Sequence, residues 1–280
     1  MRRQLLEYYK TVQDYHRIAE ESHASEMVSA DLLLQYVDRT GLILDVAGGT
    51  GFNAEFLKIP ASHYICADLS ILGLSIAKEK NRGSVVLTDA ANLPIRNDSV
   101  GVVLCSWSFE HFPNPEEILT EMIRVVRPGG RIVIWGPNWD NIFRINFPQF
   151  DHEPKSYAEK VRWRIFLQMI RNEFLPFRYK PYVNLNVAAL AQPEKYVSWD
   201  SDAVHCALCQ ETYKWFKKKG CTIVHISDFA EVPSTIRNDL LTRLARRILT
   251  PLLPLLRRIP LLRWFIIRFP IVIEAPETKS

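Results

Sequence analysis

Three aspartates end or follow three predicted strands in the first third of the chain: Asp45, Asp68 and Asp89. Each comes at the end of a short apolar, partly β-branched run that is typical of a buried strand. The carboxyl ends of parallel strands meet at one edge of a sheet, so these carboxylates are expected to lie together. There they could accept hydrogen bonds from an ammonium group, from two ribose hydroxyls, and from an adenine amino group whose ring passes the small Ala90. The three acids predict a site for a nucleoside without a phosphate.

A glycine-rich turn follows Asp45, where residues 47–51 read Ala-Gly-Gly-Thr-Gly between a strand and a helix start. Glycine permits positive φ and a close ligand approach, and a helix N-terminus offers free N–H groups. The run Gly49-x-Gly51-x-x-Ala54 also satisfies the dinucleotide fingerprint, which is the alternative at this point. The carboxylate of Asp45 favours an ammonium group instead, because it would repel a pyrophosphate.

Two other groups of residues could do chemistry. Glu110 and His111 follow the fourth predicted strand, where a general base or a cofactor contact is expected; the alternative is that both only shape the loop. Cys206-x-x-Cys209, preceded by His205, has the spacing of metal ligands. It falls in a predicted helix without a second pair of ligands, so we expect no metal site.

The elements that must position these residues alternate between strand and helix. Strands are expected at 42–46, 63–67, 84–88, 100–107 and 131–135. Helices are expected at 70–80 and from 113–115 through 126, where residues 127–130 stop the chain in a turn. This alternation indicates an α/β fold with parallel strands joined by right-handed crossovers.

Four landmarks in this order resemble the class I S-adenosylmethionine-dependent methyltransferases, particularly the small-molecule and lipid methyltransferases. They are residues 45–51, Asp68, Asp89-Ala90, and Arg127-Pro128-Gly129-Gly130 before a strand. The resemblance covers about residues 41–137, and 199–227 more loosely through a helix predicted at 203–219 and a strand at 221–226. One departure is Ala47-Gly48, where the family more often shows Gly followed by Cys or Ala; both residues are small, so binding is expected to survive.

The resemblance implies a Rossmann-like fold: a mostly parallel seven-stranded sheet with an antiparallel last strand and helices on both faces. In this chain the last strand is expected at 271–274, and two insertions interrupt the fold. The expected layout is an N-terminal helical flap (1–40), a cofactor-binding core (41–137), an aromatic-rich insertion (138–198), the end of the core sheet (199–228 and 271–280) and a basic insertion (229–270).

The resemblance also implies S-adenosylmethionine as the cofactor. Asp45 and the glycine turn would hold its methionine end, Asp68 its ribose, and Asp89 with Ala90 its adenine. Glu110 and His111 are the candidate catalytic residues. The expected cofactor-binding residues are Asp45, Ala47, Gly48, Gly49, Thr50, Gly51, Asp68, Leu69, Asp89, Ala90 and Ser106.

Two segments flanking the core are rich in aromatic side chains. Residues 138–198 follow a strand whose carboxyl end faces the expected cofactor, so we predict a substrate lid; the alternative is a helical subdomain that only packs. Residues 4–38 are expected to be largely helical and to pack on the sheet as a flap. Direct ligand contact by Tyr8, Tyr9 and Tyr15 is the alternative there.

The basic insertion carries eight arginines between 237 and 268 against a single acid, Asp239, with Leu, Trp and Phe between them. No uncharged stretch approaches the ~18 residues of a membrane span. The composition is typical of an interfacial helix on anionic lipid, and a buried hairpin or an oligomer interface are the alternatives. RNA binding is disfavoured because lysine is absent from the stretch and apolar residues outnumber aromatic ones.

Composition sets the class of protein. The chain has 280 residues, 48% of them hydrophobic and 24% charged, with a net charge of +4, which indicates a globular protein with a sizeable core. Five cysteines without a framework fit a reducing compartment, and the N-terminus lacks the apolar run of a signal peptide. We therefore expect a cytoplasmic protein that associates peripherally with the inner face of a membrane, binds no nucleic acid, and has an oligomeric state that its sequence does not define.

The leading hypothesis is a methyltransferase that acts on an apolar or lipid-linked acceptor at a membrane surface. The second is a soluble methyltransferase of a sugar or secondary metabolite, with the basic insertion as a dimer interface. A third is a non-catalytic partner that keeps the fold and regulates an enzyme. The sequence does not identify the acceptor atom.

Overall fold

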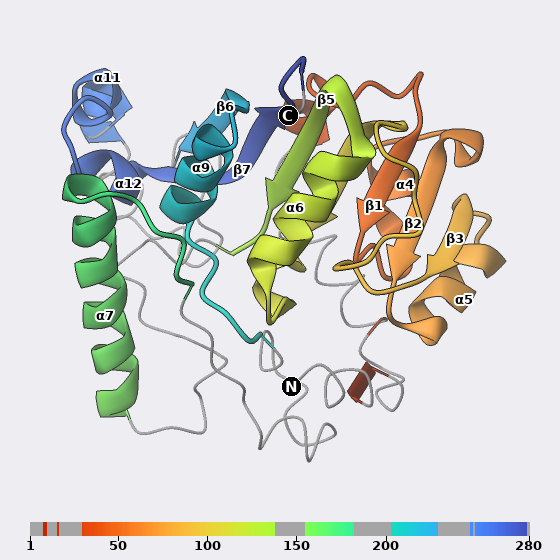
Figure 1. Ribbon diagram of the computed structural model, residues 1–280, viewed down its shortest axis with the longest axis horizontal. Helices are drawn as coiled ribbons and strands as arrows, with labels where there is room; N and C mark the ends of the chain where they lie inside the picture. Colours follow the sequence, from red (N-terminus) through yellow and green to blue (C-terminus); the bar gives the residue numbers. More distant parts are fainter. Residues whose placement is uncertain are drawn as a thin grey trace.

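The computed structural model describes residues 8, 9, 16, 30–137, 155–181, 203–228, 247, 248 and 250–278. Within them, seven strands form one sheet in the order β3-β2-β1-β4-β5-β7-β6 (Figure 1). The strands are β1 (Ile43–Val46), β2 (Tyr64–Asp68), β3 (Ser84–Leu87), β4 (Val100–Ser106), β5 (Val126–Trp135), β6 (Thr222–Asp228) and β7 (Ile267–Glu274). Strands β1 to β5 pair in parallel, and β7 is antiparallel to both β5 and β6. The expected seven-stranded fold with an antiparallel last strand is confirmed.

Helices cover the sheet on both faces because the strand order reverses between β1 and β4. Right-handed crossovers that run outward in opposite directions from that point place their helices on opposite faces. The core helices are α3 (Ala30–Leu34), α4 (Phe52–Phe56), α5 (Ile71–Glu79), α6 (Pro115–Val125) and α9 (Cys209–Lys218), with one-turn helices η1 (Ala61–His63) and η2 (Phe109–His111) between strands. Helices α6 and α9 lie side by side on one face (Figure 1).

Local chemistry explains where the core helices start. Ser70 caps α5, its Oγ accepting a hydrogen bond from the Gly73 N–H at 3.2 Å. Pro115 occupies the first turn of α6, where its missing N–H costs nothing, and an apolar stripe of that helix is buried against the sheet. Both helices therefore begin next to the carboxyl ends of the preceding strands, where the sheet leaves a crevice.

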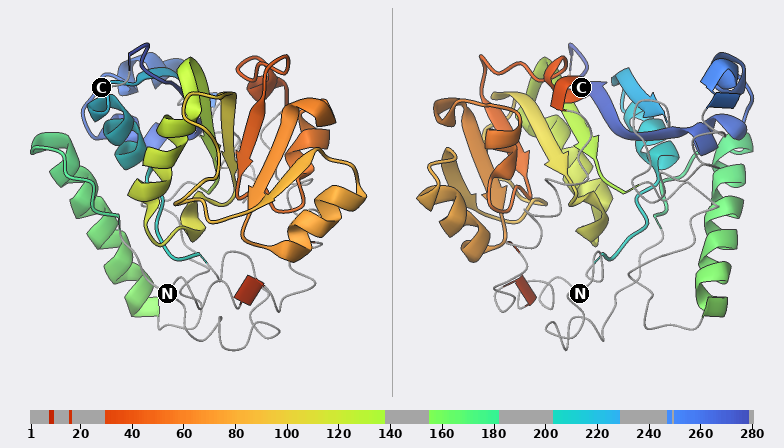
Figure 2. Two further views of the ribbon diagram at one scale, coloured as in Figure 1. Left: turned by 45° about the vertical axis from the view of Figure 1, so that its right-hand side comes forward. Right: turned by 180° about the vertical axis from the view of Figure 1, so that it is seen from behind.

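The described parts of the two insertions form one group beyond β6, at the opposite end of the sheet from β3 (Figures 1 and 2). They are α7 (Lys155–Phe174), η5 (Thr250–Leu252), α11 (Leu253–Leu256) and α12 (Leu262–Ile266). The buried carboxylate of Glu173 on α7 accepts hydrogen bonds from Arg263 Nη2 at 2.6 Å and Trp264 Nε1 at 2.9 Å on α12. Among the described residues, no helix is both long and apolar enough to cross a membrane.

Three predicted boundaries were wrong. The helix expected from Ala203 begins at Cys209, because residues 203–208 are all buried and run extended through the core rather than showing one apolar face. The last strand begins at Ile267 rather than 271, so four residues assigned to the basic insertion belong to β7, and two of them, Ile267 and Arg268, pair with β6. Strand β5 begins at Val126, and the expected turn at 127–130 is a β-irregularity inside it, with Gly129 at φ +66°.

Other predicted elements match or fall outside the described residues. The strands expected at 42–46, 63–67, 84–88 and 100–107 agree with β1 to β4 within one residue at each end. Of the expected N-terminal helical segment, the structure describes Tyr8, Tyr9, His16 and the helix at its end, α3; Tyr15 lies outside the described residues.

Candidate functional site

A cavity opens at the carboxyl ends of β1, β2, β3 and β4, at the point where the strand order reverses. Ten of the residues predicted from the sequence line it. They are Ala47, Gly48, Gly49, Thr50, Asp68, Leu69, Asp89, Ala90, Ser106 and His111. Three of the predicted residues, Asp45, Gly51 and Glu110, lie behind this wall and do not line the cavity.

The glycine turn requires its glycines for two reasons. A Cβ on Gly48 would come within 2.9 Å of the Asp45 carboxylate and of Cys66 Sγ, so no larger residue fits. Gly49 and Gly51 have φ values of +55° and +69°, which L side chains rarely adopt. Ala47 also has a positive φ, +56°, which gives a physical reason why glycine is favourable at this position.

Asp68 joins the turn to the helix after β2. Its Oδ2 accepts a hydrogen bond from the Gly49 N–H at 2.8 Å, and its Oδ1 accepts one from the Ser70 N–H at 2.6 Å. Burial raises the pKa of this carboxyl, while those N–H groups and the nearby His16 favour its charged form. Each oxygen retains a second lone pair, so the carboxylate can accept two ligand hydroxyls.

His16, from the N-terminal segment, lies over this part of the site. A hydrogen bond of 2.7 Å joins its Nε2 to Ser70 Oγ, and its side chain is buried. A Cβ on Gly73 would come within 3.0 Å of the His16 ring, so glycine at that position makes room for the imidazole. His16 and Tyr9 both line the cavity, so Tyr9 is placed where the alternative of ligand contact by the flap would require it.

Asp45 sits under the glycine turn as an internal acceptor. Its Oδ2 accepts hydrogen bonds from the Tyr64 hydroxyl and, at 2.8 Å, from Asn53 Nδ2. Burial raises the pKa of Asp45 to about 7, although these two hydrogen bonds oppose the shift. Asn53 Nδ2 also donates to Ser106 Oγ at 2.6 Å, so this amide ties β1, α4 and β4 together at the cavity wall.

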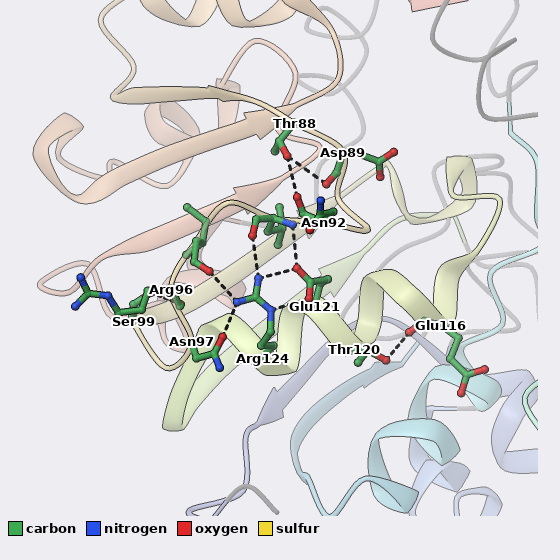
Figure 3. A network of polar contacts seen from close by, with 12 residues as sticks. Thr88, Asp89, Asn92, Arg96, Asn97, Ser99, Glu116, Thr120, Glu121 and Arg124 are labelled. Carbon is green, nitrogen blue, oxygen red and sulfur yellow. Dashed lines mark hydrogen bonds and ion pairs between the residues drawn. The ribbon is translucent and has the colours of Figure 1, made fainter.

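The connector after β3 is held by α6. Arg124 on α6 donates to the carbonyl oxygens of Leu93 and Ile95 at 2.9 and 2.8 Å, and Glu121 accepts from the Leu93 N–H at 2.9 Å (Figure 3). At the start of this connector, Asp89 Oδ1 accepts from the Ala91 N–H at 2.8 Å. These bonds fix the loop that carries Asp89 and Ala90 at the cavity.

Glu110 and His111 occupy different positions although they are neighbours. His111 lines the cavity, whereas the Glu110 side chain is 1% exposed behind it, with 3.9 Å between Glu110 Oε1 and His111 Nε2. The Glu110 carbonyl accepts from the N–H groups of Val204 and His205, both at 2.9 Å. Burial lowers the pKa of His205 to about 3, so this ring is neutral.

Sequence reasoning missed His16, Asn53 and Trp107 as cavity residues and raised Tyr9 only as an alternative. Asn53 carried a weak signal, because a polar side chain in the first turn after the glycines is well placed to reach the adjacent strand ends. No group of three or more His, Cys, Asp or Glu that could hold a metal occurs in the described part of the chain, where Cys206 and Cys209 are buried and not joined in a disulfide.

Comparisons with known proteins agree with this arrangement. A family model described as a methyltransferase domain matches residues 44–134. The demethylmenaquinone methyltransferase of Clavibacter sepedonicus is 36% identical over 96 residues, which are 33% of this chain and 39% of that protein. The enzyme of the same name from Thermus thermophilus is 30% identical over 181 residues, which are 59% of this chain and 74% of that protein.

Solved structures extend the likeness in fold to most of the chain. An S-adenosylmethionine-dependent methyltransferase from Mesorhizobium loti matches 89% of this chain and 98% of its own length, with a TM-score of 0.51 and 14% identity. This match concerns the fold alone. The chain spans less than half the length of several curated relatives that it matches.

Proposed function

Because the chain belongs to the class I S-adenosylmethionine-dependent methyltransferase family, we propose that its cavity binds S-adenosylmethionine and that the protein transfers the methyl group to an apolar, quinone-type acceptor. The observation that carries the proposal is the carboxylate of Asp68, held at the cavity wall by Gly49 and Ser70 with lone pairs left for two ribose hydroxyls. S-adenosylmethionine supplies an electrophilic methyl group on a sulfonium centre.

The remaining wall supports specific roles for the other residues. Asp89 and Ala90 would accept the adenine amino group and leave room for its ring, and the turn at 47–50 would contact the methionine part. Asp45 would not contact the cofactor directly. It would act from beneath the glycine turn, where its hydrogen bond holds Asn53 and the end of β1 in place. Leu69 and Ser106, at the ends of β2 and β4, would complete the wall.

An apolar acceptor is supported by the aromatic side chains of the cavity. Tyr9, Phe52, Trp107 and Phe112 line it, and two of them come from the segment after β4, next to His111. A flat quinone-derived ring would pack against such side chains. Both curated relatives described above are named demethylmenaquinone methyltransferases, and a further relative, from Pasteurella multocida, is named a ubiquinone/menaquinone biosynthesis C-methyltransferase, which indicates methylation of carbon in that protein.

Methylation of a ring carbon forms a carbon–carbon bond, breaks the carbon–sulfur bond, and releases the proton of that carbon. His111 is the proposed proton acceptor, since its imidazole lines the cavity and the buried Glu110 carboxyl lies 3.9 Å behind it. The walls would exclude water and hold the acceptor in line with the methyl group.

We also propose that the basic insertion holds the protein on an anionic membrane, where a quinone with a lipid tail resides. In its described part, Arg247, Ile248, Leu255 and Arg258 are exposed. Arg257 and Arg263 have partners inside the protein, Asp228 at 2.5 Å and Glu173 at 2.6 Å. The exposed Arg247 and Arg258 are therefore the better candidates for lipid contact.

The test is a transfer assay with methyl-labelled S-adenosylmethionine and a water-soluble demethylnaphthoquinol that carries a short side chain. We expect label in the product, located on a ring carbon by mass spectrometry and unaffected by a chelator. Asp68→Ala should abolish it at limiting cofactor. Label that appears on a sugar or on no acceptor while the cofactor binds normally would contradict the acceptor proposal.

A further inference from the structure

Helix α7 exposes an apolar stripe that takes no part in the cavity. The side chains of Trp163, Leu167 and Phe174 are 63%, 60% and 64% exposed. Their spacing of four and seven residues places them on one helix face. Val161 and Met169, on the opposite face, are buried. Helix α7 is therefore apolar on both faces, and its outer apolar face is open to solvent.

Positive charge borders this stripe. Between residues 155 and 181 the chain has seven Lys or Arg and two Glu. Glu173 is bound internally by Lys214 at 3.1 Å and Arg263 at 2.6 Å, whereas Lys160, Arg164 and Arg178 are exposed. Aromatic and aliphatic side chains with a basic border are the composition of helices that lie in an anionic lipid interface. A second copy would bring like charges together.

The helix that carries the stripe is bound to the basic insertion. Glu173 on α7 binds Arg263 and Trp264 on α12, and α7 lies at the same end of the molecule as α11 in all views (Figures 1 and 2). Leu252 and Leu255, which are 44% and 59% exposed, add apolar side chains on η5 and α11 at this end of the molecule. Two segments about 90 residues apart in sequence are thus joined here by the Glu173–Arg263 pair.

We propose that α7 is a membrane-binding element, with Trp163, Leu167 and Phe174 inserted into an anionic phospholipid interface beside η5 and α11. This inference rests on the proposed membrane association of the basic insertion and assigns to it a second helix. It also gives the described part of the aromatic insertion a role other than the expected lid: no residue of 155–181 lines the cavity.

The test is flotation with vesicles of phosphatidylcholine, with and without phosphatidylglycerol. A triple variant replaces Trp163, Leu167 and Phe174 by Ser; the control is Leu87→Ser, which is 59% exposed on β3 at the far edge of the sheet. We expect the triple variant to bind phosphatidylglycerol vesicles about a thousandfold more weakly, since each of the three large apolar side chains withdrawn from water favours binding by roughly tenfold. Leu87→Ser should bind like the wild type.

Two further measurements separate the loss of lipid insertion from a loss of folding or of cofactor binding. Brominated lipid should quench wild-type tryptophan fluorescence more than that of Trp163→Phe, a variant that keeps an aromatic ring and the fold. Calorimetry with S-adenosylmethionine should give the same affinity for all variants, because α7 is outside the cavity. This isolates the membrane question from the proposed cofactor site and reaction.

Each remaining outcome overturns the inference. If the triple variant floats like the wild type while Arg247→Gln/Arg258→Gln does not, the basic insertion binds lipid without α7. If the wild type never floats, the membrane part of the proposed function fails as well, although methyl transfer to a soluble quinol can still succeed. If the wild type self-associates without lipid and the triple variant is monomeric in sedimentation, the stripe is a contact between copies.

Discussion

The carboxylate of Asp68 accepts a hydrogen bond from the backbone N–H of Gly49 at 2.8 Å. This bond joins the end of β2 to the glycine turn after β1, and it aligns the two parts of the cavity that would hold the ribose and the methionine of the cofactor. His16 reaches the same region through Ser70, which makes the N-terminal segment part of the site.

We therefore expect His16→Ala to weaken S-adenosylmethionine binding by about thirtyfold, because it removes a hydrogen bond and packing that are each worth roughly 1 kcal/mol. Titration calorimetry measures the effect. His63→Ala, a change in η1 away from the cavity, is the control. An unchanged affinity in folded His16→Ala would show that the flap is not part of the binding site.

Asp45 should make stability depend on pH. Its folded-state pKa is raised to about 7, above the ~4 of an unfolded chain, so the folded state binds the proton more tightly. The stabilisation that comes from this proton is fully present below about pH 4. It is lost as the pH rises towards 7, which lowers the free energy of unfolding by up to about 4 kcal/mol.

Asp45→Asn removes this titration. Urea unfolding of both proteins between about pH 4 and 8 should therefore show Asp45→Asn gaining stability relative to the wild type as pH rises. A constant difference between the two proteins over that range would mean that Asp45 does not titrate there.

Much of this site follows from the sequence. Buried runs followed by an acid are enough to predict β1, β2 and β3 and the edge at which they end, because parallel strands bring their carboxyl ends together. The direction in which a side chain points depends on its packing partners, which a short stretch of sequence does not reveal. Asp45 points beneath the turn to Tyr64 and Asn53, and only the packed sheet reveals this.

Contacts between segments that are far apart in the chain could not be predicted from the sequence either. His16 is hydrogen-bonded to Ser70, which is 54 residues away in sequence, and Glu173 is hydrogen-bonded to Trp264, which is 91 residues away. Helical periodicity could therefore predict a buried helix face but not the segment that packs against it. The helix expected from residue 203 was wrong for a related reason: tertiary burial of residues 203–208 overrides helix propensity.

Glu173 should stabilise the joint between α7 and α12. Burial opposes its ionisation, yet hydrogen bonds from Trp264 and Lys214 and the charge of Arg263 leave the pKa lowered. A lowered carboxyl pKa gives stability that is present above the unfolded pKa and is lost as pH falls through the folded pKa.

Glu173→Gln should thus reduce the free energy of unfolding by about 2 kcal/mol at neutral pH, and by less below about pH 4. Chemical denaturation at the two pH values measures both quantities. Glu159→Gln, an exposed site on the same helix, is the control. An equal effect of Glu173→Gln at both pH values would contradict the assigned network.

The exposed arginines of the basic insertion should govern attraction to anionic vesicles. Arg247→Gln with Arg258→Gln is expected to remove about 2 kcal/mol, since each arginine near such a surface contributes about 1 kcal/mol, and high salt should imitate the change. Arg257 is left intact because it neutralises Asp228. Flotation that is independent of both the substitutions and salt would rule out an electrostatic membrane contact.

The central claim is that Asp68 anchors S-adenosylmethionine at the end of β2. Calorimetric titration of the wild type and Asp68→Ala with S-adenosylmethionine and with NADH tests it directly. We expect one site for S-adenosylmethionine, none for NADH, and an affinity at least about tenfold lower in Asp68→Ala, because hydrogen bonds to a charged group are worth roughly 1.5–3 kcal/mol. Tight NADH binding without S-adenosylmethionine binding, or an unchanged affinity in folded Asp68→Ala, would contradict it.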